Sequence, residues 1–531
     1  MVAPCLTAGC CVMSVKPALC GFFFFIEPKI MKNIVFNTKY LEDVSSFYKE
    51  YCHQNNTIIF ESAEIVDKSG VQSLIGVSAA LKVTCDDLLK VTATALNENG
   101  NGLLKLLSEK LKVQIEGNSF SLSFNRPPKD LDEDSRLKAP NPMDVLRALQ
   151  KLLKPCDGIF VGGVIAFDYI NNFEYIGDVP KGENPCSDYG FYVFDLSIRS
   201  NHQKKTTSVN AYIFNEESYK DLAFSALQFR DKIDEFKPHD LYQIKKVTPK
   251  IDPDLDDKTF GGMVQKIKDH IVAGDAFQIV PSRSFKYECK DPLKAYNYLK
   301  RLNPSPYMYY IKDPKFTIFG ASPEFAIRFE ADSRTVSISP IAGTRARGLN
   351  EDGSVNKELD SRIELELRTD KKEVAEHLML VDLARNDLAR ISKTGTRYVD
   401  NMLHIDKYQA VMHLVSDVHG TLKDDLDGLQ AYLACMNMGT LSGAPKIKAH
   451  ELIYKYEGKK RGSYGGVIAI LGNDGSFDSC IAIRSVFVKD ETAYVQAGCG
   501  VVFDSNIQAE CQETVNKAKS VLNALALACE E

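Results

Sequence analysis

The sequence of 531 residues contains no tryptophan, although chance alone would supply several. It has no basic surplus either, because 65 lysines and arginines stand against 71 aspartates and glutamates, a formal net charge of −6. Such a balance offers little to neutralise a phosphate backbone, so no nucleic acid is expected as a partner. The apolar run Phe22–Ile26 is too short for a signal-peptide core or a membrane span, so no membrane partner is expected.

The 14 cysteines include no C-x-x-C pair and form no disulfide framework. This pattern predicts reduced thiols in a cytoplasmic protein, with disulfides as the alternative. Four cysteines lie in the first twenty residues, and a second methionine, Met31, then opens a segment of ordinary composition. Residues 1–30 are therefore predicted to be a non-native or disordered extension.

The composition, 44% hydrophobic and 26% charged, is that of a globular protein, and the length allows several domains or one large body. No G-x-G-x-x-G motif follows a strand to open a helix, which disfavours a dinucleotide-binding fold. Strands in meander-like runs with helices interspersed predict an α+β fold.

Hydrophobic periodicity predicts long helices at Lys371–Ala389 and Ala509–Leu525. Strands are predicted at Lys112–Ile115 and, as one continuous strand, at Cys480–Val488. The polar, proline-bearing stretch Arg126–Pro142 is predicted to be a surface loop.

The two long helices each carry acids on one face. Glu373 and Glu376 are three residues apart, as are Glu510 and Glu513, with Lys517 one turn further along. A solvated helix surface would show the same spacing. Two such faces could also bind one magnesium ion, which prefers oxygen ligands and usually takes one or two carboxylates.

Three glycine-bearing stretches, PIAGTR (340–345), GTLSGAPKI (439–447) and QAGCGV (496–501), allow backbone N–H groups to approach an anion. Arg345 and Arg484 could add contacts to carboxylates. Each stretch alone is most simply a tight turn, but together they suggest a small dianionic substrate.

Two further side chains allow a plain and a catalytic interpretation. Glu324, in GASPE, is an edge carboxylate or a general acid. His413, in VMHLVS, is a core histidine or a catalytic one.

Ten motifs stand in the order found in chorismate-utilising enzymes, and they most closely resemble the large subunits of anthranilate synthase. The motifs are AGDAFQIVPSR, NPSPYMYY, GASPE, PIAGTR, EHLMLVDLARND, VMHLVSDVHG, GTLSGAPKI, YGGVIAI, CIAIRS and VQAGCGVV. The resemblance implies two packed, mainly antiparallel sheets flanked by helices. It also implies a regulatory region over 31–250 and a chorismate-binding region over 255–527, intertwined in one body.

The resemblance assigns roles residue by residue. Glu376 and Glu513 would bind magnesium, supported by Glu373 and Glu510. The catalytic residues would be Glu324, His413, Thr344 and Gln278. The substrate-binding residues would be Gly343, Thr344, Arg345, Tyr464, Arg484, Gly498, Cys499, Gly500 and Lys517, although Cys499 stands where alanine is usual.

Two positions discriminate within the family. Relatives that make aminodeoxychorismate commonly have a nucleophilic lysine where this chain has Ala342. Relatives that add water commonly have a lysine base where this chain has Gln278. Both positions favour direct addition of ammonia over these sister reactions, and the presence of every catalytic acid disfavours an inactive regulatory homologue.

The implied reaction converts chorismate and ammonia to anthranilate and pyruvate, at the entry to tryptophan synthesis. Ammonia would come from a separate glutamine amidotransferase subunit, with a heterotetramer as the expected assembly. Tryptophan is the expected feedback inhibitor, and an enzyme made when tryptophan is scarce does well to contain none. Its site would comprise Glu61, Ser62, Asn303, Pro306, Tyr307 and Met308, with Phe60 standing where leucine is usual.

Overall fold

The structure is a computed structural model that describes residues 31–62, 72–86, 88–238, 242–350, 354–408 and 411–530. The predicted extension, residues 1–30, lies outside the described residues. The ten cysteines that follow Met31 are all free, and eight of them are buried. Among the described residues, no helix is both long enough and apolar enough to cross a membrane.

The helices are distributed along the whole described chain. They are α1 (Val44–Tyr51), α2 (Glu98–Leu111), α3 (Glu133–Lys138), α4 (Met143–Leu153), α5 (Tyr219–Glu235), α6 (Asp257–Val272), α7 (Pro292–Leu302), α8 (Lys357–Thr369), α9 (Lys371–Ile391), α10 (Gly428–Cys435), α11 (Lys446–Glu457) and α12 (Ile507–Cys529), with short 3₁₀ helices η1 (Phe167–Asn172) and η2 (Glu216–Ser218).

The strands alternate with these helices. They are β1 (Lys32–Thr38), β2 (Thr57–Glu61), β3 (Gln72–Cys85), β4 (Lys90–Ala95), β5 (Ser119–Ser123), β6 (Phe160–Ile165), β7 (Tyr189–Asn201), β8 (Thr206–Ile213), β9 (Gln278–Ile279), β10 (Ser282–Glu288), β11 (Tyr307–Lys312), β12 (Thr317–Ser322), β13 (Phe325–Glu330), β14 (Thr335–Ile338), β15 (Ile341–Ala346), β16 (Tyr398–Lys407), β17 (Val411–Thr421), β18 (Gly443–Ala444), β19 (Val467–Leu471), β20 (Phe477–Ile481), β21 (Ser485–Lys489) and β22 (Thr492–Gly498).

The larger strands form one hydrogen-bonded network that closes on itself, and β9 and β18 form a separate small sheet. Neighbouring strands run antiparallel, including the pairs that join the two halves of the chain, β2 with β11 and β6 with β19. The N-terminal and C-terminal regions therefore share a sheet, and the two predicted sheets are continuous with each other.

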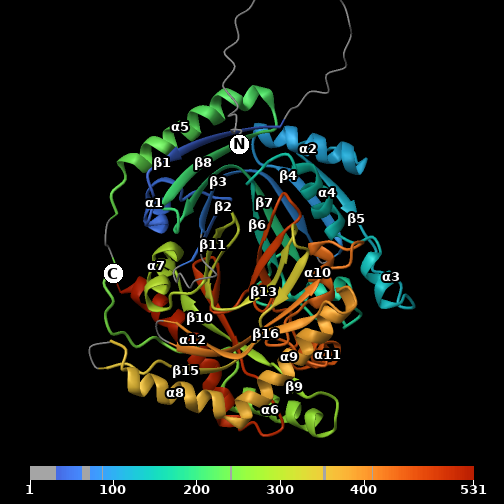
Figure 1. The fold of residues 1–531 in the computed structure, drawn as a ribbon, viewed down its shortest axis with the longest axis vertical. Coiled ribbons are helices and arrows are strands. Elements are labelled where there is room, and N and C mark those ends of the chain that lie inside the picture. The colour runs from blue at the N-terminus through green and yellow to red at the C-terminus, as the bar shows by residue number, and fades with distance from the viewer. Residues whose placement is uncertain are drawn as a thin grey trace, which may run out of the picture.

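Helices cover the outside of this network on opposite sides (Figure 1). In the view of Figure 1, α2 and α5 lie above the N-terminal strands, whereas α8, α9 and α12 lie below the C-terminal ones. The predicted α+β class, with mainly antiparallel strands and flanking helices, is confirmed.

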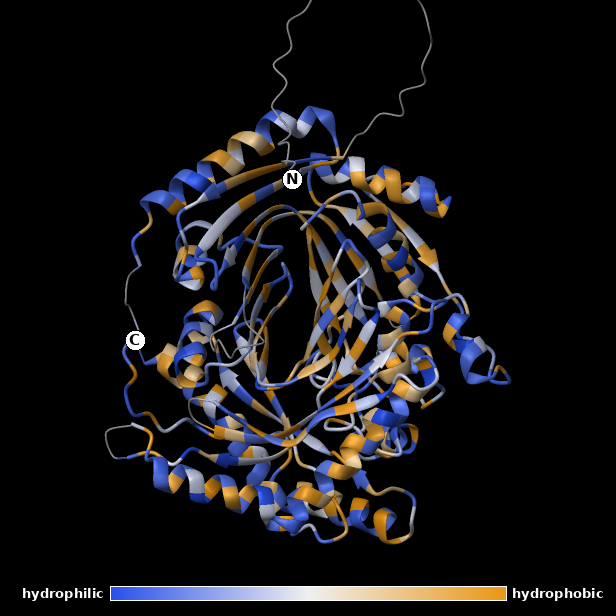
Figure 2. Cartoon of the chain, viewed as in Figure 1, coloured by the Kyte–Doolittle hydropathy of each residue, from blue (hydrophilic) through white to orange (hydrophobic). Residues whose placement is uncertain are grey.

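The helices that matter most for function begin at side-chain caps. The Asp370 carboxylate accepts hydrogen bonds from the backbone N–H groups of Lys372 and Glu373 at the start of α9. The Asn506 side chain accepts one from Ala509 at the start of α12. Hydrophilic and hydrophobic residues alternate along these helices, so each presents an apolar side to the core and a polar side elsewhere (Figure 2).

Three local predictions were wrong. No strand forms at Lys112–Ile115, because Lys112 adopts a left-handed φ of 56° as the C-cap of α2. The loop Arg126–Pro142 contains α3, which Asp132 caps through the backbone N–H of Ser135. The single strand predicted at Cys480–Val488 is two strands, because Arg484 has a φ of 49° and interrupts the ladder between β20 and β21.

Two glycines in helices differ in the space around them, and Gly100 shows how closely α2 approaches the sheet. A Cβ on Gly100 would lie 1.9 Å from the backbone oxygen of Ala80 in β3, whereas a Cβ on Gly262 in α6 would meet nothing within 4 Å. Gly100→Ala should lower the free energy of unfolding by about 1–3 kcal/mol through overpacking. Gly262→Ala should raise it by roughly 0.5–1 kcal/mol through higher helix propensity. Urea denaturation of both variants checks this, and equal effects would contradict the close approach.

Candidate active site

Two helices from distant parts of the sequence bring four carboxylates into one electrostatic environment. Burial and the charges of Glu373, Glu510 and Glu513 together raise the pKa of Glu376 to about 7, while the charge of Lys372 opposes them. Burial also raises the pKa of Glu510. The predicted grouping of these acids is therefore present, and a solvated helix surface does not describe it.

The oxygens of this cluster fit a hard cation. Glu510 is only 4% exposed, and its Oε2 atom has no hydrogen-bond partner. Oε1 of Glu376 also has none. Among the described residues, no three or more acidic, histidine or cysteine side chains stand ready-made around one point as metal ligands. Since magnesium usually takes only one or two carboxylates, the unsatisfied oxygens of Glu376 and Glu510 are compatible with such an ion.

Glu324 lies between β12 and β13, and its side chain is almost fully buried. Burial raises the pKa of its carboxyl to about 8, against the opposing effects of a hydrogen bond from Thr440 and of the nearby charges on Lys517 and Arg484. The Thr440 hydroxyl donates to Oε1 at 3.1 Å. Glu324 therefore carries a proton at neutral pH and can donate it, as a general acid must.

His413 lies beside Thr344, its register partner across β17 and β15. Nδ1 of the imidazole lies 2.9 Å from the Thr344 hydroxyl, and the two groups share a hydrogen bond. Burial lowers the pKa of His413 to about 4, with the Arg484 charge acting in the same direction. The ring is therefore a neutral imidazole held by a hydrogen bond, an arrangement that fits a satisfied core histidine as well as a catalytic one.

Arg484 connects these groups electrostatically. Burial lowers the pKa of its guanidinium, while Tyr464, Glu513 and Glu324 act in the opposite direction. No hydrogen bond or ion pair links this guanidinium to another residue in the part of the chain that the structure describes. A partly buried, unsatisfied guanidinium is suited to a carboxylate ligand.

The QAGCGV stretch packs closely against Tyr464 and Gln278. A Cβ on Gly498 would lie 3.0 Å from the Tyr464 hydroxyl, and one on Gly500 would lie 2.6 Å from Nε2 of Gln278. Lys517 donates to the Gly498 carbonyl at 3.0 Å. Cys499, between the two glycines, is fully buried, and burial raises the pKa of its thiol.

Gln278, in β9, is buried, and its side chain lies against Gly500. Its Oε1 atom has no hydrogen-bond partner. An uncharged amide at this position offers an acceptor but no base.

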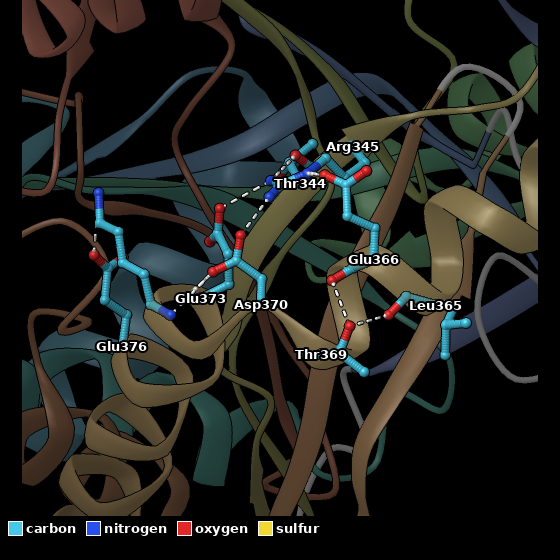
Figure 3. Close-up of polar contacts among 9 residues, drawn as sticks. Thr344, Arg345, Leu365, Glu366, Thr369, Asp370, Glu373 and Glu376 are labelled. Atoms are coloured by element: carbon cyan, nitrogen blue, oxygen red, sulfur yellow. Dashed lines mark hydrogen bonds and ion pairs between the residues drawn. The ribbon is translucent and has the colours of Figure 1, made fainter.

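Gly343 and Arg345 flank Thr344 in β15 but differ in their surroundings. Gly343 has a φ of 77°, and a Cβ there would lie 2.9 Å from a Leu367 methyl group, so glycine is required. The guanidinium of Arg345 contacts Glu373, Asp370 and Glu366 on helices α8 and α9 (Figure 3). Arg345 was predicted to bind substrate, but its side chain is engaged by three protein carboxylates.

Two buried arginines hold the surrounding elements together. Arg283 is 1% exposed and donates to the Thr514 hydroxyl and to the Cys511 carbonyl, which fixes α12 against β10. Arg461, equally buried, binds Glu457 and donates to the carbonyls of Leu441 and Val280.

The chain is similar to known proteins over most of its length. A model of the family described as chorismate binding enzyme matches residues 107–523. Anthranilate synthase component 1 of Vibrio cholerae serotype O1 is 45% identical over 504 residues, covering 92% of this chain and 95% of that protein. The protein of the same name from Escherichia coli K12 is also 45% identical, with 92% and 96% covered. This chain belongs to the chorismate binding enzyme family.

Solved structures agree with this membership. The crystal structure of anthranilate synthase component I from Streptococcus pneumoniae TIGR4 superposes with a TM-score of 0.65 at 30% identity, covering 86% of this chain and 93% of that one. The menaquinone-specific isochorismate synthase MenF of E. coli, at 16% identity and a TM-score of 0.66, shares the fold. The resemblance in the ten motifs is confirmed, and the chain is a chorismate-utilising enzyme by homology.

The residues predicted to bind tryptophan gather where β2 pairs with β11, with Glu61 opposite Met308. The Glu61 carboxylate accepts a hydrogen bond from the Tyr296 hydroxyl at 2.5 Å and pairs with Lys300 at 2.7 Å. The Tyr307 hydroxyl instead contacts Asp478 and Arg328. Asn303 and Pro306 lie in the connection from α7 to β11, and Ser62 directly follows β2.

Phe60 lies on the other side of β2 from Glu61, next to the Phe160 ring at a centroid distance of 5.5 Å. The predicted residues of the regulatory site are thus brought into one region but distributed over both faces of the sheet.

Several residues around the site were not singled out from the sequence. Thr440 lies within a motif that was noted only for its glycines, although its hydroxyl binds Glu324. Arg461 and Glu457 form a buried i, i+4 pair, a spacing that is visible in the sequence, although their burial is not.

A spectroscopic titration tests the protonation of Glu324. Infrared spectra should show a protonated-carboxyl band at neutral pH that is absent from Glu324→Gln. Because burial raises the pKa, the band should persist below about pH 8 and disappear as the pH rises through that value. The exposed Glu330→Gln is the matched control. Loss of the band near pH 4–5, the ordinary range for a carboxyl group (about 4.3 for Glu), would contradict the assignment.

Proposed function

We propose that this chain is component 1 of an anthranilate synthase, a lyase that converts chorismate and ammonia to anthranilate and pyruvate in tryptophan synthesis. The names of its relatives support the reaction. The observation that carries the proposal is the buried Glu324 carboxyl, which accepts a hydrogen bond from Thr440 at 3.1 Å and whose pKa responds to the nearby positive charges of Arg484 and Lys517. That combination suits a reaction in which a hydroxyl group leaves from a dianionic substrate.

The site offers separate contacts for the two carboxylates of chorismate. Arg484, with no protein partner among the described residues, would bind one carboxylate bidentately, next to Tyr464. The backbone at Gly343, Thr344, Gly498 and Gly500 would lie close to the ring of the substrate. A larger side chain in place of any of the three glycines would occupy that space. Lys517 would complete the charge balance.

Magnesium is the proposed cofactor. Glu376 and Glu513 would hold it, with Glu373 and Glu510 in the same cluster, and the unsatisfied oxygens of Glu376 and Glu510 support this. When bound, the ion supplies positive charge for the ring carboxylate of the substrate.

The chemistry then follows from the chain's own residues. The nitrogen lone pair of ammonia forms a bond to C2, the ring double bonds shift, and the C4–O bond breaks. Glu324 gives its proton to the leaving oxygen, which departs as water. His413, held by Thr344, stays neutral beside the ring. The intermediate then loses its C2 proton, the electrons of that C–H bond complete the aromatic ring, and the C3–O bond breaks. The released enolpyruvate takes up a proton to become pyruvate, and the extra proton on the added nitrogen is the equivalent that returns Glu324 to its acid form.

Ammonia is the proposed nucleophile because the two positions that distinguish the sister reactions carry neither a base nor a nucleophile. Gln278 cannot deprotonate water, and Ala342 cannot form a covalent adduct. A pocket beside Glu324 and Thr440 is lined mostly by apolar side chains, such as Ile338, Leu380 and Met438. Its other carboxylate, Asp387, is paired with Lys446 at 2.6 Å. A lining without an unpaired carboxylate suits a small neutral molecule better than an ammonium ion.

The name component 1, carried by the relatives, implies a second component. We propose that it is a separate glutamine amidotransferase that supplies ammonia, in a cytoplasmic heterotetramer.

An assay of the purified chain tests the reaction directly. With chorismate, magnesium and an ammonium salt, anthranilate fluorescence should appear, and it should be lost with EDTA. Glutamine in place of ammonium should give no product, because the partner is missing. Glu324→Gln should lower the rate by about 10²–10⁴-fold, the usual contribution of a general acid. Consumption of chorismate without fluorescence would indicate a sister reaction, and no consumption would indicate an inactive homologue.

Tryptophan should inhibit this reaction through the region around Glu61 and Ser62. Ser62→Arg introduces a long cation there and should relieve inhibition while leaving the uninhibited rate close to wild type. Inhibition curves measured at fixed chorismate check this. Equal inhibition of wild type and variant would rule out Ser62 as part of the regulatory site.

A further inference from the structure

Three of the four carboxylates in the α9–α12 cluster are paired with basic side chains of the protein. Arg345 contacts Glu373 at 2.8 Å, and Lys517 contacts Glu513 at 2.6 Å. Lys372 lies 3.7 Å from Oε1 of Glu376. These internal cations come from β15, α12 and α9, and they reduce the repulsion that four neighbouring carboxylates would otherwise experience.

Arg345 differs from the two lysines because its guanidinium contacts three carboxylates at once. Its Nη1 contacts Glu373, its Nη2 contacts Asp370 at 3.0 Å, and its Nε lies 3.5 Å from Glu366 (Figure 3). Nη1 also donates to the Thr344 carbonyl at 3.1 Å. If Glu373 turned away, the guanidinium would keep its contacts with two carboxylates and a carbonyl. Release of Glu373 would therefore leave no buried charge without a partner.

Glu373 is the residue that this contact restrains. Its Oε1 binds Arg345, and its Oε2 lies beside Gly343, 3.1 Å from the position that a Cβ would occupy there. The carboxylate is thus turned toward β15, at Gly343 and Arg345. Asp370 stays in place in either case, because its other oxygen caps α9 through the N–H groups of Lys372 and Glu373.

We propose that Arg345 is a built-in counter-cation that holds Glu373 in the metal-free protein and competes with a divalent cation for that carboxylate. This inference rests on the magnesium site of the proposed function. Metal binding would transfer Glu373 from the guanidinium to the ion, and Arg345 would remain paired with Asp370 and Glu366. Arg345 is then a positioning residue for the metal site, in place of the substrate contact that the sequence predicts.

The experiment measures divalent-cation affinity without turnover. Mn²⁺ is titrated into the full-length protein without substrate, and free Mn²⁺ is followed by electron paramagnetic resonance. Arg345→Gln removes the competitor but keeps a polar side chain of similar reach. The apparent Kd for Mn²⁺ should fall by about two- to fivefold, as expected for the loss of one partly exposed ion pair.

Arg347→Gln is the matched control. Arg347 lies two residues along the chain and pairs with Asp360 at 2.7 Å, which is not one of the four acids. It removes the same charge from the same region, so its Mn²⁺ affinity should stay within about 1.5-fold of wild type, as expected for a screened charge at greater distance. Thermal melting of each metal-free variant shows whether it is folded. Arg345→Met, which also lacks the charge, provides a second test variant if Arg345→Gln does not fold, and Arg345→Lys is the variant that keeps the charge.

Each outcome decides between specific alternatives. Tighter Mn²⁺ binding by Arg345→Gln, with Arg347→Gln unchanged, supports the competition, and Arg345→Lys should then bind Mn²⁺ about as wild type does. Weaker binding would show that Arg345 supports the ligands instead, and unchanged binding with a raised KM for chorismate would return it to the substrate; either result overturns the inference. Absence of Mn²⁺ binding by the wild-type protein would instead refute the metal site of the proposed function.

Discussion

The catalytic arrangement depends on two guanidinium groups that are buried in the protein and fully satisfied there. Arg283 ties α12 to β10, and Arg461 ties the turn around Leu441 to the segment before β10. Each head group donates to two backbone carbonyls, and a buried polar group left unsatisfied costs about 1–3 kcal/mol. These contacts fix the elements that carry Glu510, Glu513 and Gln278. The positions of these site residues therefore depend on contacts made outside the site.

Burial acts with opposite effects on the two titratable groups closest to the proposed chemistry. It keeps Glu324 protonated and His413 neutral, so neither carries a charge at neutral pH. Positive charge is supplied by Arg484 and Lys517. Neutral side chains beside positive ones suit an anionic substrate that must lose a hydroxyl group as water.

Much of this could be predicted from the sequence, and the reasons for the failures are physical. The helices α9 and α12 follow from hydrophobic periodicity, and their paired acids follow from the i, i+3 spacing. The interruption at Arg484 could not be predicted, because a non-glycine residue with positive φ is set by its tertiary surroundings. The ion pairs of Arg345 could not be predicted either, since Glu366, Asp370 and Glu373 approach it only once α8 and α9 pack against β15. The pKa of Glu324 depends on burial by residues as distant in sequence as Thr440.

The pairing of β2 with β11 and of β6 with β19 has a consequence for how the protein is made. Strands that leave the ribosome early must wait, with their edges unpaired, for partners synthesised hundreds of residues later. Such high contact order slows folding and exposes strand edges to other chains. Helix α12, which carries Glu510 and Glu513, emerges long after α9, so a nascent chain has its complete acid cluster only once α12 has been synthesised. Chaperones that shield unpaired edges should therefore matter more to the yield of this enzyme than its equilibrium stability would suggest.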